Sequence, residues 1–252
     1  MADHELKAVV LDLFDTIVKW QPERLPQMQW RERTFPSPLP HVLPTLEQRL
    51  GARFDRETFL EVYHAVVEEI NAERERHFTE TTCHERFTRA LDRFGHPEAH
   101  ERSNLAANLT SAYMALVRAV TAAPPEWSAA VRRIGGRFRL GLVSNFDDAA
   151  TGRAVLSDTG VAHLFEAVII SAEVGMRKPN PKIYERVLDA MKLRPEEVLF
   201  VGDTPREDVA GPKRARMRVA WVNRRRGPLP EGVPQPDFVV EDLAALPALL
   251  GL

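Results

Sequence analysis

The spacing of hydrophobic residues divides the chain into three parts with different predicted structures. Residues 8–11 are apolar throughout, which is typical of a short strand buried on both faces of a parallel sheet. From residue 41 to about 120, apolar side chains recur every three or four positions. This spacing predicts helices, and no strand pattern interrupts them. From residue 127 onward, helical stretches alternate with short apolar runs, as in βαβ units around a parallel sheet.

The apolar runs and the helix start and stop signals place the individual elements. The predicted strands of the alternating part span 139–143, 167–170, 198–201, 219–222 and, at a sheet edge, 238–240. The predicted helices of the same part span 127–134, 149–159, 181–191, 209–216 and 243–250. In the helical stretch, Asp55 is predicted to begin one helix, and Gly51 and Gly95 are predicted to end two others.

A segment rich in proline and aromatic residues, 19–40, separates the first strand from the helical stretch. Prolines at this density interrupt helices and sheet ladders, so we expect an extended or looped segment. Its aromatic residues are expected to pack against a neighbouring helix rather than to line a pocket. The sequence therefore predicts an α/β core formed by residues 1–18 and 121–252. It predicts a helical domain, residues 19–120 with the proline-rich entry segment, inserted as a separate unit.

Composition and charge narrow the range of functions. The net charge of −2 gives no overall electrostatic attraction to nucleic acid or to an acidic membrane. No run approaches the ~20 apolar residues that cross a bilayer, and the charged N-terminus lacks an apolar signal region. The single cysteine, Cys83, excludes an intrachain disulfide and suits a reducing compartment. We therefore expect a cytoplasmic protein that binds neither nucleic acid nor membrane.

Polar side chains follow three of the predicted strands, and a lysine precedes one of the predicted helices. These residues are Asp12, Asp15 and Thr16 after 8–11, Ser144 and Asn145 after 139–143, Lys178 before 181–191, and Gly202, Asp203 and Asp208 after 198–201. The carboxyl ends of parallel strands are where open α/β sheets place ligand chemistry. The chain thus supplies carboxylates, a hydroxyl group, an ammonium group and backbone donors at one expected edge.

That set of groups suits the transfer of a phosphoryl group through an aspartyl intermediate. A carboxylate that attacks phosphorus divides one difficult displacement into two easier steps. Prepositioned donors and cations then stabilise the charge on the phosphoryl oxygens. Mg²⁺ prefers oxygen ligands, and it offsets the repulsion between an anionic nucleophile and an anionic substrate.

In these four segments the chain resembles the haloacid dehalogenase (HAD) superfamily of hydrolases. Asp12 to Thr16 resemble the nucleophile motif, and Ser144-Asn145 resemble the second motif. Lys178-Pro179 resemble the third motif, and Gly202-Asp203-Thr204 with Asp208 resemble the fourth, in the family's order. The resemblance implies a Rossmann-like parallel-sheet core with an inserted all-helical cap of the C1 type, between the first and second motifs.

The resemblance also implies a role for each matching residue. Asp12 is the implied nucleophile, with Thr16 orienting its carboxylate, and Ser144 and Lys178 hold the transferring group. Asn145 and Phe14 join Ser144 and Lys178 in the implied substrate site. The implied ligands of Mg²⁺ are Asp12, the main-chain carbonyl of Phe14, Asp203 and Asp208, the last directly or through water. The substrate class implied is a small phosphorylated metabolite.

The sequence departs from the family's phosphatases at Phe14, where these carry an aspartate that acts as acid and base. The adjacent Asp15 is not expected to replace it, because on a strand-like backbone its side chain points away from that of Phe14. A positioned acid or base typically contributes ~10²–10⁴ in rate. Its loss matters least for a leaving group that departs readily without a proton.

Three functions stay open on these residues. The first is a Mg²⁺-dependent phosphatase or phosphotransferase with reduced or narrow activity. The second is a metal-independent 2-haloacid dehalogenase-like hydrolase, which Phe14 and Tyr184 resemble, although Tyr184 is also interpreted as a core residue. The third is a non-catalytic phosphate-binding protein. Asp203 and Asp208 favour the first, because carboxylates close to Asp12 repel one another without a cation.

Overall fold

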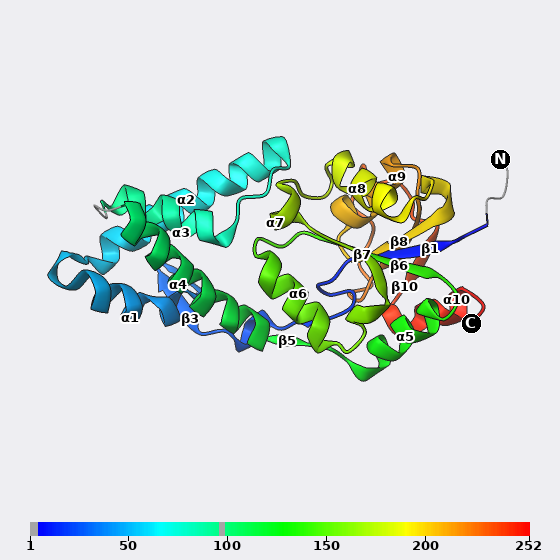
Figure 1. The fold of residues 1–252 in the computed structure, drawn as a ribbon, viewed down its shortest axis with the longest axis horizontal. Coiled ribbons are helices and arrows are strands. Elements are labelled where there is room, and N and C mark those ends of the chain that lie inside the picture. Colours follow the sequence, from blue (N-terminus) through cyan, green and yellow to red (C-terminus); the bar gives the residue numbers. More distant parts are fainter. Residues whose placement is uncertain (1–4, 96–98) are drawn as a thin grey trace. The chain divides into compact units, whose positions relative to one another are not determined.

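The computed structural model describes residues 5–95 and 99–252, so the start of the charged N-terminus, residues 1–4, lies outside the described part. The chain forms two compact units, shown in Figure 1. One unit comprises Met1–Trp20 and Ala122–Leu252, and the other comprises Gln21–Thr121. The first unit is therefore built from both ends of the chain, with the second inserted after its first strand.

The first unit is built on a six-stranded parallel sheet with the strand order β10-β9-β8-β1-β6-β7. The strands are β1 (Ala8–Leu11), β6 (Arg139–Ser144), β7 (Phe165–Ile170), β8 (Val198–Gly202), β9 (Arg218–Val222) and β10 (Phe238–Val240). Every residue of β1 and β8 is buried, as expected for strands covered on both faces. The chain runs from β1 outward to β7 on one side and from β8 to β10 on the other, so β1 lies where the strand order reverses.

Helices cover both faces of this sheet (Figure 1). They are α5 (Pro125–Gly135), α6 (Ala149–Asp158), α7 (Ser171–Val174), α8 (Pro181–Met191), α9 (Gly211–Arg214) and α10 (Leu246–Leu249). Side chains of α5, α6 and α10 pack with Val9 and Leu11 of β1. Side chains of α8 pack with Ala8 and Val10, which point to the opposite face. This architecture confirms the predicted Rossmann-like α/β core.

The second unit contains four helices in its described residues, together with a β-hairpin. The helices are α1 (Leu39–Leu50), α2 (Arg56–His77), α3 (Cys83–Phe94) and α4 (Ala99–Ala119). Asp55 caps the start of α2, because its carboxylate accepts the Thr58 N–H at 2.7 Å. Gly51 and Gly95 end α1 and α3, as their positions in the sequence predict.

The proline-rich segment differs from the predicted loop. It contains strands β3 (Gln27–Trp30) and β4 (Arg33–Pro36), which pair antiparallel. Pro26 lies just outside this ladder and Pro36 lies at its last pair, so neither occupies the middle of a strand. With this hairpin the inserted unit is not purely helical. Two further short strands, β2 (Lys19–Trp20) and β5 (Thr121–Ala122), pair with each other where the chain passes between the units.

Several elements begin or end at other residues than predicted. The predicted helix 209–216 begins earlier, as a π-helical turn at Pro205–Ala210, and continues as α9. The closing helix begins as a 3₁₀ turn at Leu243–Ala245 before α10. Other 3₁₀ turns of the described chain were not predicted. They span Pro22–Arg24, Gly51–Arg53, Ala162–Leu164 and, just before β8, Pro195–Glu197. Among the described helices, none combines the length and the apolar character that crossing a membrane requires.

Candidate active site

Asp12 stands at the carboxyl end of the central strand. Its backbone N–H donates to the Val201 carbonyl of β8 at 2.9 Å, which continues the β1–β8 ladder by one residue. The chain then turns, because the N–H groups of Ile17 and Val18 both donate to the Leu13 carbonyl, at 2.8 and 3.0 Å. The side chain of Asp12 is 9% exposed. A rigid strand end and a tight turn therefore fix this carboxylate in an almost dry position.

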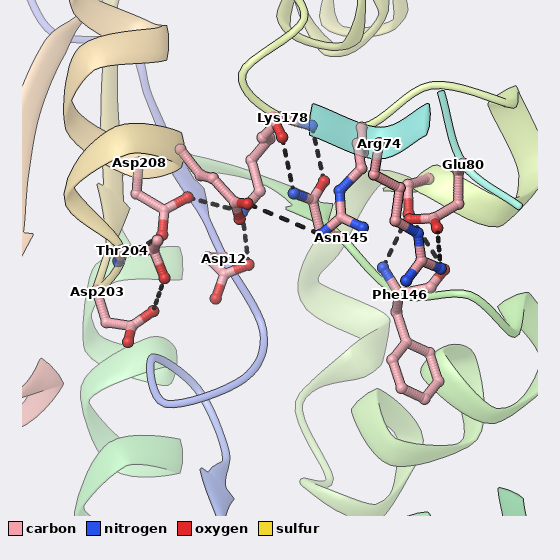
Figure 2. A network of polar contacts seen from close by, with 12 residues as sticks. Asp12, Arg74, Glu80, Asn145, Phe146, Lys178, Asp203, Thr204 and Asp208 are labelled. Atoms are coloured by element: carbon pink, nitrogen blue, oxygen red, sulfur yellow. Dashed lines mark hydrogen bonds and ion pairs between the residues drawn. The ribbon is translucent and has the colours of Figure 1, made fainter. Parts of the chain in front are cut away.

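Asn145, which follows β6, holds the backbone of Lys178. The Asn145 side-chain oxygen accepts the Lys178 N–H at 2.7 Å, and its Nδ2 donates to the Lys178 carbonyl at 3.0 Å. These two bonds use both polar atoms of the amide (Figure 2). Asn145 therefore positions Lys178 at the sheet edge, while its predicted contact with substrate stays a prediction.

The Lys178 ammonium group joins two carboxylates that are far apart in the sequence. Its Nζ lies 2.7 Å from Asp12 Oδ1 and 2.7 Å from Asp208 Oδ1. Figure 2 shows Lys178 reaching toward both carboxylates. The Nζ also lies 5.5 Å from the centre of the Phe200 ring, a cation–π contact. The side chains of Lys178 and Asp208 are each 1% exposed, so these are fully buried ion pairs.

The π-helical turn after β8 brings Asp203 and Asp208 to the same place. Asp208 Oδ2 accepts the Thr204 N–H at 2.9 Å, and Asp203 Oδ1 accepts the Thr204 hydroxyl at 3.1 Å (Figure 2). Gly202 permits this turn, because a Cβ at that position would lie 2.6 Å from Asp208 Oδ2. The Trp221 indole N–H holds the turn from the other side by donating to the Asp203 carbonyl at 2.9 Å.

Burial and repulsion between neighbouring carboxylates raise the pKa values of Asp12 and Asp203. Burial raises the pKa of Asp12, and the carboxylates of Asp208 and Asp203 raise it further, against the lowering by Lys178. Burial, together with Asp208 and Asp15, raises the pKa of Asp203 to about 6. Burial disfavours the charged form of Lys178, but Asp12 and Asp208 hold its pKa above the ordinary value. The ammonium group thus stays charged among carboxylates that repel one another.

The carboxylates of Asp12, Asp203 and Asp208 fit a hard divalent cation. One ligand oxygen from each of these residues lies within 4.8 Å of the others. Oxygen-only ligand sets that include carboxylates are typical of Mg²⁺. The structure therefore brings together three of the four residues predicted to bind the metal. The participation of the Phe14 carbonyl stays a prediction.

Within the described part of the core unit, two buried hydroxyl groups have no hydrogen-bond partner. They belong to Thr16 and Ser144, both of which are fully buried. A buried polar atom without a partner costs free energy, roughly 1–3 kcal/mol, so such atoms commonly serve a ligand or a functional site. This observation agrees with the roles that the resemblance implies for both residues, which stay predictions.

Phe14 contributes an aromatic ring where the family's phosphatases have a carboxyl group. Its ring lies 4.8 Å from that of Phe146, centre to centre, and 6.2 Å from that of Trp20 in an edge-on arrangement.

The next residue, Asp15, has φ 55° and lies in a turn, so the strand-like backbone predicted for it is wrong. Its Oδ1 is 2.7 Å from Nη1 of Arg224 and accepts the Trp20 N–H at 3.3 Å. Asp15 therefore holds the turn through Arg224 and Trp20, and its exclusion as the general acid stays a prediction.

Ser171 is a site residue that the sequence analysis missed. It is fully buried at the start of α7, where its Oγ accepts the Phe146 N–H at 2.8 Å and donates to the Phe146 carbonyl at 3.1 Å. It thereby fixes the loop that carries Ser144 and Asn145. The signal was present, since Ser171 is the polar residue directly after β7, the same position that Asp12 occupies after β1.

Tyr184 is a core residue rather than an open catalytic group. It is fully buried on α8, and its hydroxyl donates a hydrogen bond to the Glu207 carbonyl in the π-helical turn. Burial raises the pKa of this hydroxyl, so it remains a donor. Gly211 provides the space, because a Cβ there would lie 2.6 Å from Tyr184 Cζ. Tyr184 thus ties the helix after Lys178 to the turn that carries Asp208.

Two curated proteins resemble parts of this chain. A phosphoserine phosphatase of Thermus thermophilus is 44% identical over 92 residues, which is 36% of this chain and 36% of that protein. The (S)-2-haloacid dehalogenase 2 of a Pseudomonas species is 32% identical over 115 residues, which is 46% of this chain and 49% of that protein. The chain thus spans about half or less of the length of these relatives.

A solved structure and a family model cover more of the chain. The 2-haloacid dehalogenase of Pseudomonas syringae superimposes with a TM-score of 0.70 at 20% identity, over 98% of each chain. At that identity the likeness concerns the fold. The family model of the haloacid dehalogenase-like hydrolases matches residues 6–216, a range that includes every site residue predicted from the sequence. A match over most of the chain shows the family, and the chain belongs to the haloacid dehalogenase-like hydrolases.

Proposed function

We propose that this chain is a Mg²⁺-dependent phosphohydrolase that transfers the phosphoryl group of a small phosphorylated metabolite to Asp12 and then to water. The observation that carries this proposal is the cluster of Asp12, Asp203, Asp208 and Lys178, buried except for the partly exposed Asp203, which holds three acidic groups for one ammonium group. Such a surplus of negative charge favours a bound cation. It also suits a reaction that brings a second anion to Asp12.

In the first step, a carboxylate oxygen of Asp12 forms a bond to phosphorus. The bond between phosphorus and the leaving oxygen breaks, and that oxygen keeps the electron pair and takes a proton from water. In the second step, a water oxygen bonds to phosphorus, the bond from phosphorus to Asp12 breaks, and the water proton passes to solvent. Two displacements of this kind restore the free carboxylate.

Other residues of the cluster support both steps. Lys178 is already 2.7 Å from Asp12 Oδ1, and in the proposed reaction its charge stabilises the transferring phosphoryl oxygens. The unpartnered hydroxyls of Thr16 and Ser144 are the proposed donors to Asp12 and to the phosphoryl group. Asp12, Asp203, Asp208 and the Phe14 carbonyl would hold Mg²⁺, which when bound offsets the repulsion between carboxylate and phosphate.

The inserted unit, Gln21–Thr121, is the proposed specificity element. It follows the segment with Asp12 and precedes Ser144, which is where the family inserts its cap. The similarity to a phosphoserine phosphatase supports a phosphorylated substrate of small size.

A second candidate is a 2-haloacid dehalogenase-like activity, in which Asp12 attacks carbon and a halide departs. Phe14 and the similarity to the Pseudomonas dehalogenase support it. Two observations oppose it. Tyr184 is buried and bonded to the Glu207 carbonyl, and Asp203 and Asp208 crowd the nucleophile with negative charge. The phosphohydrolase is therefore the better supported proposal.

The test is product release by the full chain from phosphate esters, acetyl phosphate and 2-chloropropionate, with Mg²⁺ or with EDTA. We expect phosphate release that requires Mg²⁺ and is abolished in Asp12→Asn. The matched control is Asp15→Asn, which removes a neighbouring carboxylate that the structure assigns to Arg224 and should keep most of the activity.

Other outcomes would contradict the proposal. Chloride release that is insensitive to EDTA would support the dehalogenase. Phosphate binding without turnover of any of these substrates would support the non-catalytic function. A phosphoryl label on the trapped wild-type protein should map to Asp12, and a label on another residue would remove Asp12 from its proposed role.

A further inference from the structure

An aromatic cluster follows the carboxyl ends of the neighbouring strands β1 and β6, the sheet edge at which Asp12 lies. It consists of Phe14, two residues after Asp12, Phe146, two residues after Ser144, and Trp20. The ring of Phe14 lies 4.8 Å from that of Phe146 and 6.2 Å from that of Trp20. All three side chains are partly exposed, and Phe14 also packs against the core of this unit, so the cluster presents aromatic surface on a packed base.

Backbone contacts hold the cluster in place. The Phe146 N–H and carbonyl are both bonded to Ser171 Oγ, and the carbonyl also accepts the Ala172 N–H at 3.2 Å. Gly152 lies beneath the ring, because a Cβ there would be 3.2 Å from Phe146 Cδ1. The aromatic surface is therefore prearranged, which lowers the entropic cost of binding against it.

The acidic groups around Asp12 in the described core unit have partners or belong to the proposed metal site. Asp203 accepts the Thr204 hydroxyl at 3.1 Å and is one of the three carboxylates proposed to hold the metal. Asp15 is paired with Arg224, whose guanidinium lies 5.1 Å from the centre of the Trp127 ring. Asp208 uses one oxygen on Lys178 and the other on the Thr204 N–H. The Glu207 carboxylate lies 3.7 Å from the guanidinium of Arg177. The position two residues after Asp12 offers a ring and no proton.

We propose, resting on the phosphohydrolase function above, that the substrates of this chain are aryl phosphates, in which the leaving oxygen is attached directly to an aromatic ring. Two features of the site meet in this class. The leaving phenoxide departs without a positioned acid, because a phenol, with a pKa of about 10, is far more acidic than an alkyl alcohol. The aromatic ring packs against Phe14 and Phe146 in an offset or edge-on arrangement.

The experiment compares four phosphates on the full chain with Mg²⁺. Phenyl phosphate has a ring and an acidic leaving group, and benzyl phosphate has a ring and a basic one. Acetyl phosphate has an acidic leaving group without a ring, and ethyl phosphate has neither. We expect kcat/KM for phenyl phosphate to exceed that for benzyl phosphate by about 100-fold or more, the size of a missing acid. Equal rates on phenyl and benzyl phosphate would overturn the proposal.

Variants of the cluster test separately the two features of the proposal, the missing acid and the packing of the substrate ring. Phe14→Asp should reduce the phenyl-to-benzyl ratio by ten-fold or more, whereas Phe14→Asn, of the same size without an acid, should leave the ratio high. Phe146→Leu should raise KM for phenyl phosphate several-fold and leave KM for acetyl phosphate unchanged. A ratio that is the same in Phe14→Asp and Phe14→Asn, or a KM for phenyl phosphate that Phe146→Leu does not change, would contradict the proposal. Thermal unfolding of each variant verifies that it is folded.

The outcome also distinguishes this proposal from the one on which it rests. If wild-type protein hydrolyses none of the four phosphates, acetyl phosphate included, the phosphohydrolase itself is wrong. If it hydrolyses acetyl phosphate with Mg²⁺ and shows no preference for phenyl over benzyl phosphate, only the aryl specificity is wrong.

Discussion

Carboxylates at the two ends of the parallel sheet have opposite charge environments and opposite pKa shifts. Where β1 and β8 begin, the Glu197 carboxylate lies 2.8 Å from Lys7 Nζ and 3.0 Å from the Arg194 guanidinium, and it accepts the Arg194 N–H at 2.9 Å. The hydrogen bonds from Lys7 and Arg194 lower the pKa of Glu197 to about 2. Where the same strands end, burial and neighbouring carboxylates instead raise the pKa values of Asp12 and Asp203.

This contrast distinguishes a charge-compensated carboxylate from the cluster that is proposed to be functional, on the same sheet. At the first end, two cations surround one carboxylate, so the charged form is stabilised by the protein alone. At the second end, Lys178 serves two carboxylates and a third lies next to them. The protein holds these like charges together only because the fold fixes their backbones, and a cation or a proton relieves their repulsion. This surplus of negative charge is the reason for proposing a metal site at this end of the sheet.

The largest expected effect on stability comes from removing the ammonium group that Asp12 and Asp208 share. Lys178→Met should lower the free energy of unfolding by about 3–5 kcal/mol, because it leaves buried carboxylates without a partner. Urea unfolding measures this loss. Lys182→Met is the matched control, since Lys182 is exposed on α8, four residues further on, and should change stability little. A loss in Lys178→Met no larger than in Lys182→Met would break the comparison, because the cluster would then not depend on its ammonium group.

An intermediate effect should follow from a methyl group next to Asp208. In Gly202→Ala the new Cβ would lie 2.6 Å from Asp208 Oδ2, so the carboxylate or the strand end must move. We expect a loss of about 1–3 kcal/mol, the range for overpacking, together with weaker binding of Mg²⁺ measured by titration.

Gly227→Ala provides the control for this substitution, since no atom lies within 4 Å of a Cβ at that position. If Gly202→Ala binds Mg²⁺ as wild-type protein does, the position of Asp208 does not determine the proposed metal site.

The smallest effect on stability is expected at Glu197, where β1 and β8 begin, and this effect depends on pH. Because the pKa of Glu197 is lowered from 4.5 to about 2, its contribution to stability is fully present above pH 4.5 and is lost as the pH falls toward 2. Glu197→Gln should therefore be less stable than wild-type protein at pH 7, and the difference should shrink between pH 4.5 and 2. Urea midpoints across this range measure it, and a difference that is independent of pH would assign the loss to packing rather than to charge.

The sequence predicts the strands and helices that carry the site better than the turns and the long-range contacts that link them. The limits of β1, α8 and β10 are as predicted, because each is a continuous apolar run or an amphipathic stretch with clear ends. Asp12, Lys178, Asp203 and Asp208 converge as the strand-end rule predicts. The family and its α/β core also follow from the sequence.

Features that depend on distant residues were not accessible from local pattern. The turn at Asp15 is held by Arg224, 209 residues further along the chain, so no short-range signal indicates its φ of 55°. The early start of the helix at Pro205 depends on the bond from the Thr204 N–H to Asp208 and on the Tyr184 hydroxyl. The hairpin β3–β4 was obscured by prolines that lie at its ends.

The close approach of Tyr184 and Gly211 has a consequence for how this chain can change over evolutionary time. Any side chain at position 211 would clash with the Tyr184 phenol ring. Gly211 therefore cannot be substituted without a shift of the structure as long as Tyr184 is present. A smaller residue at position 184 would make room for a side chain at position 211. It would also remove the hydrogen bond from the Tyr184 hydroxyl to the Glu207 carbonyl, which holds the turn that carries Asp208. The two positions therefore constrain each other's history, and a relative that has lost one of these residues should be searched for a compensating change at the other.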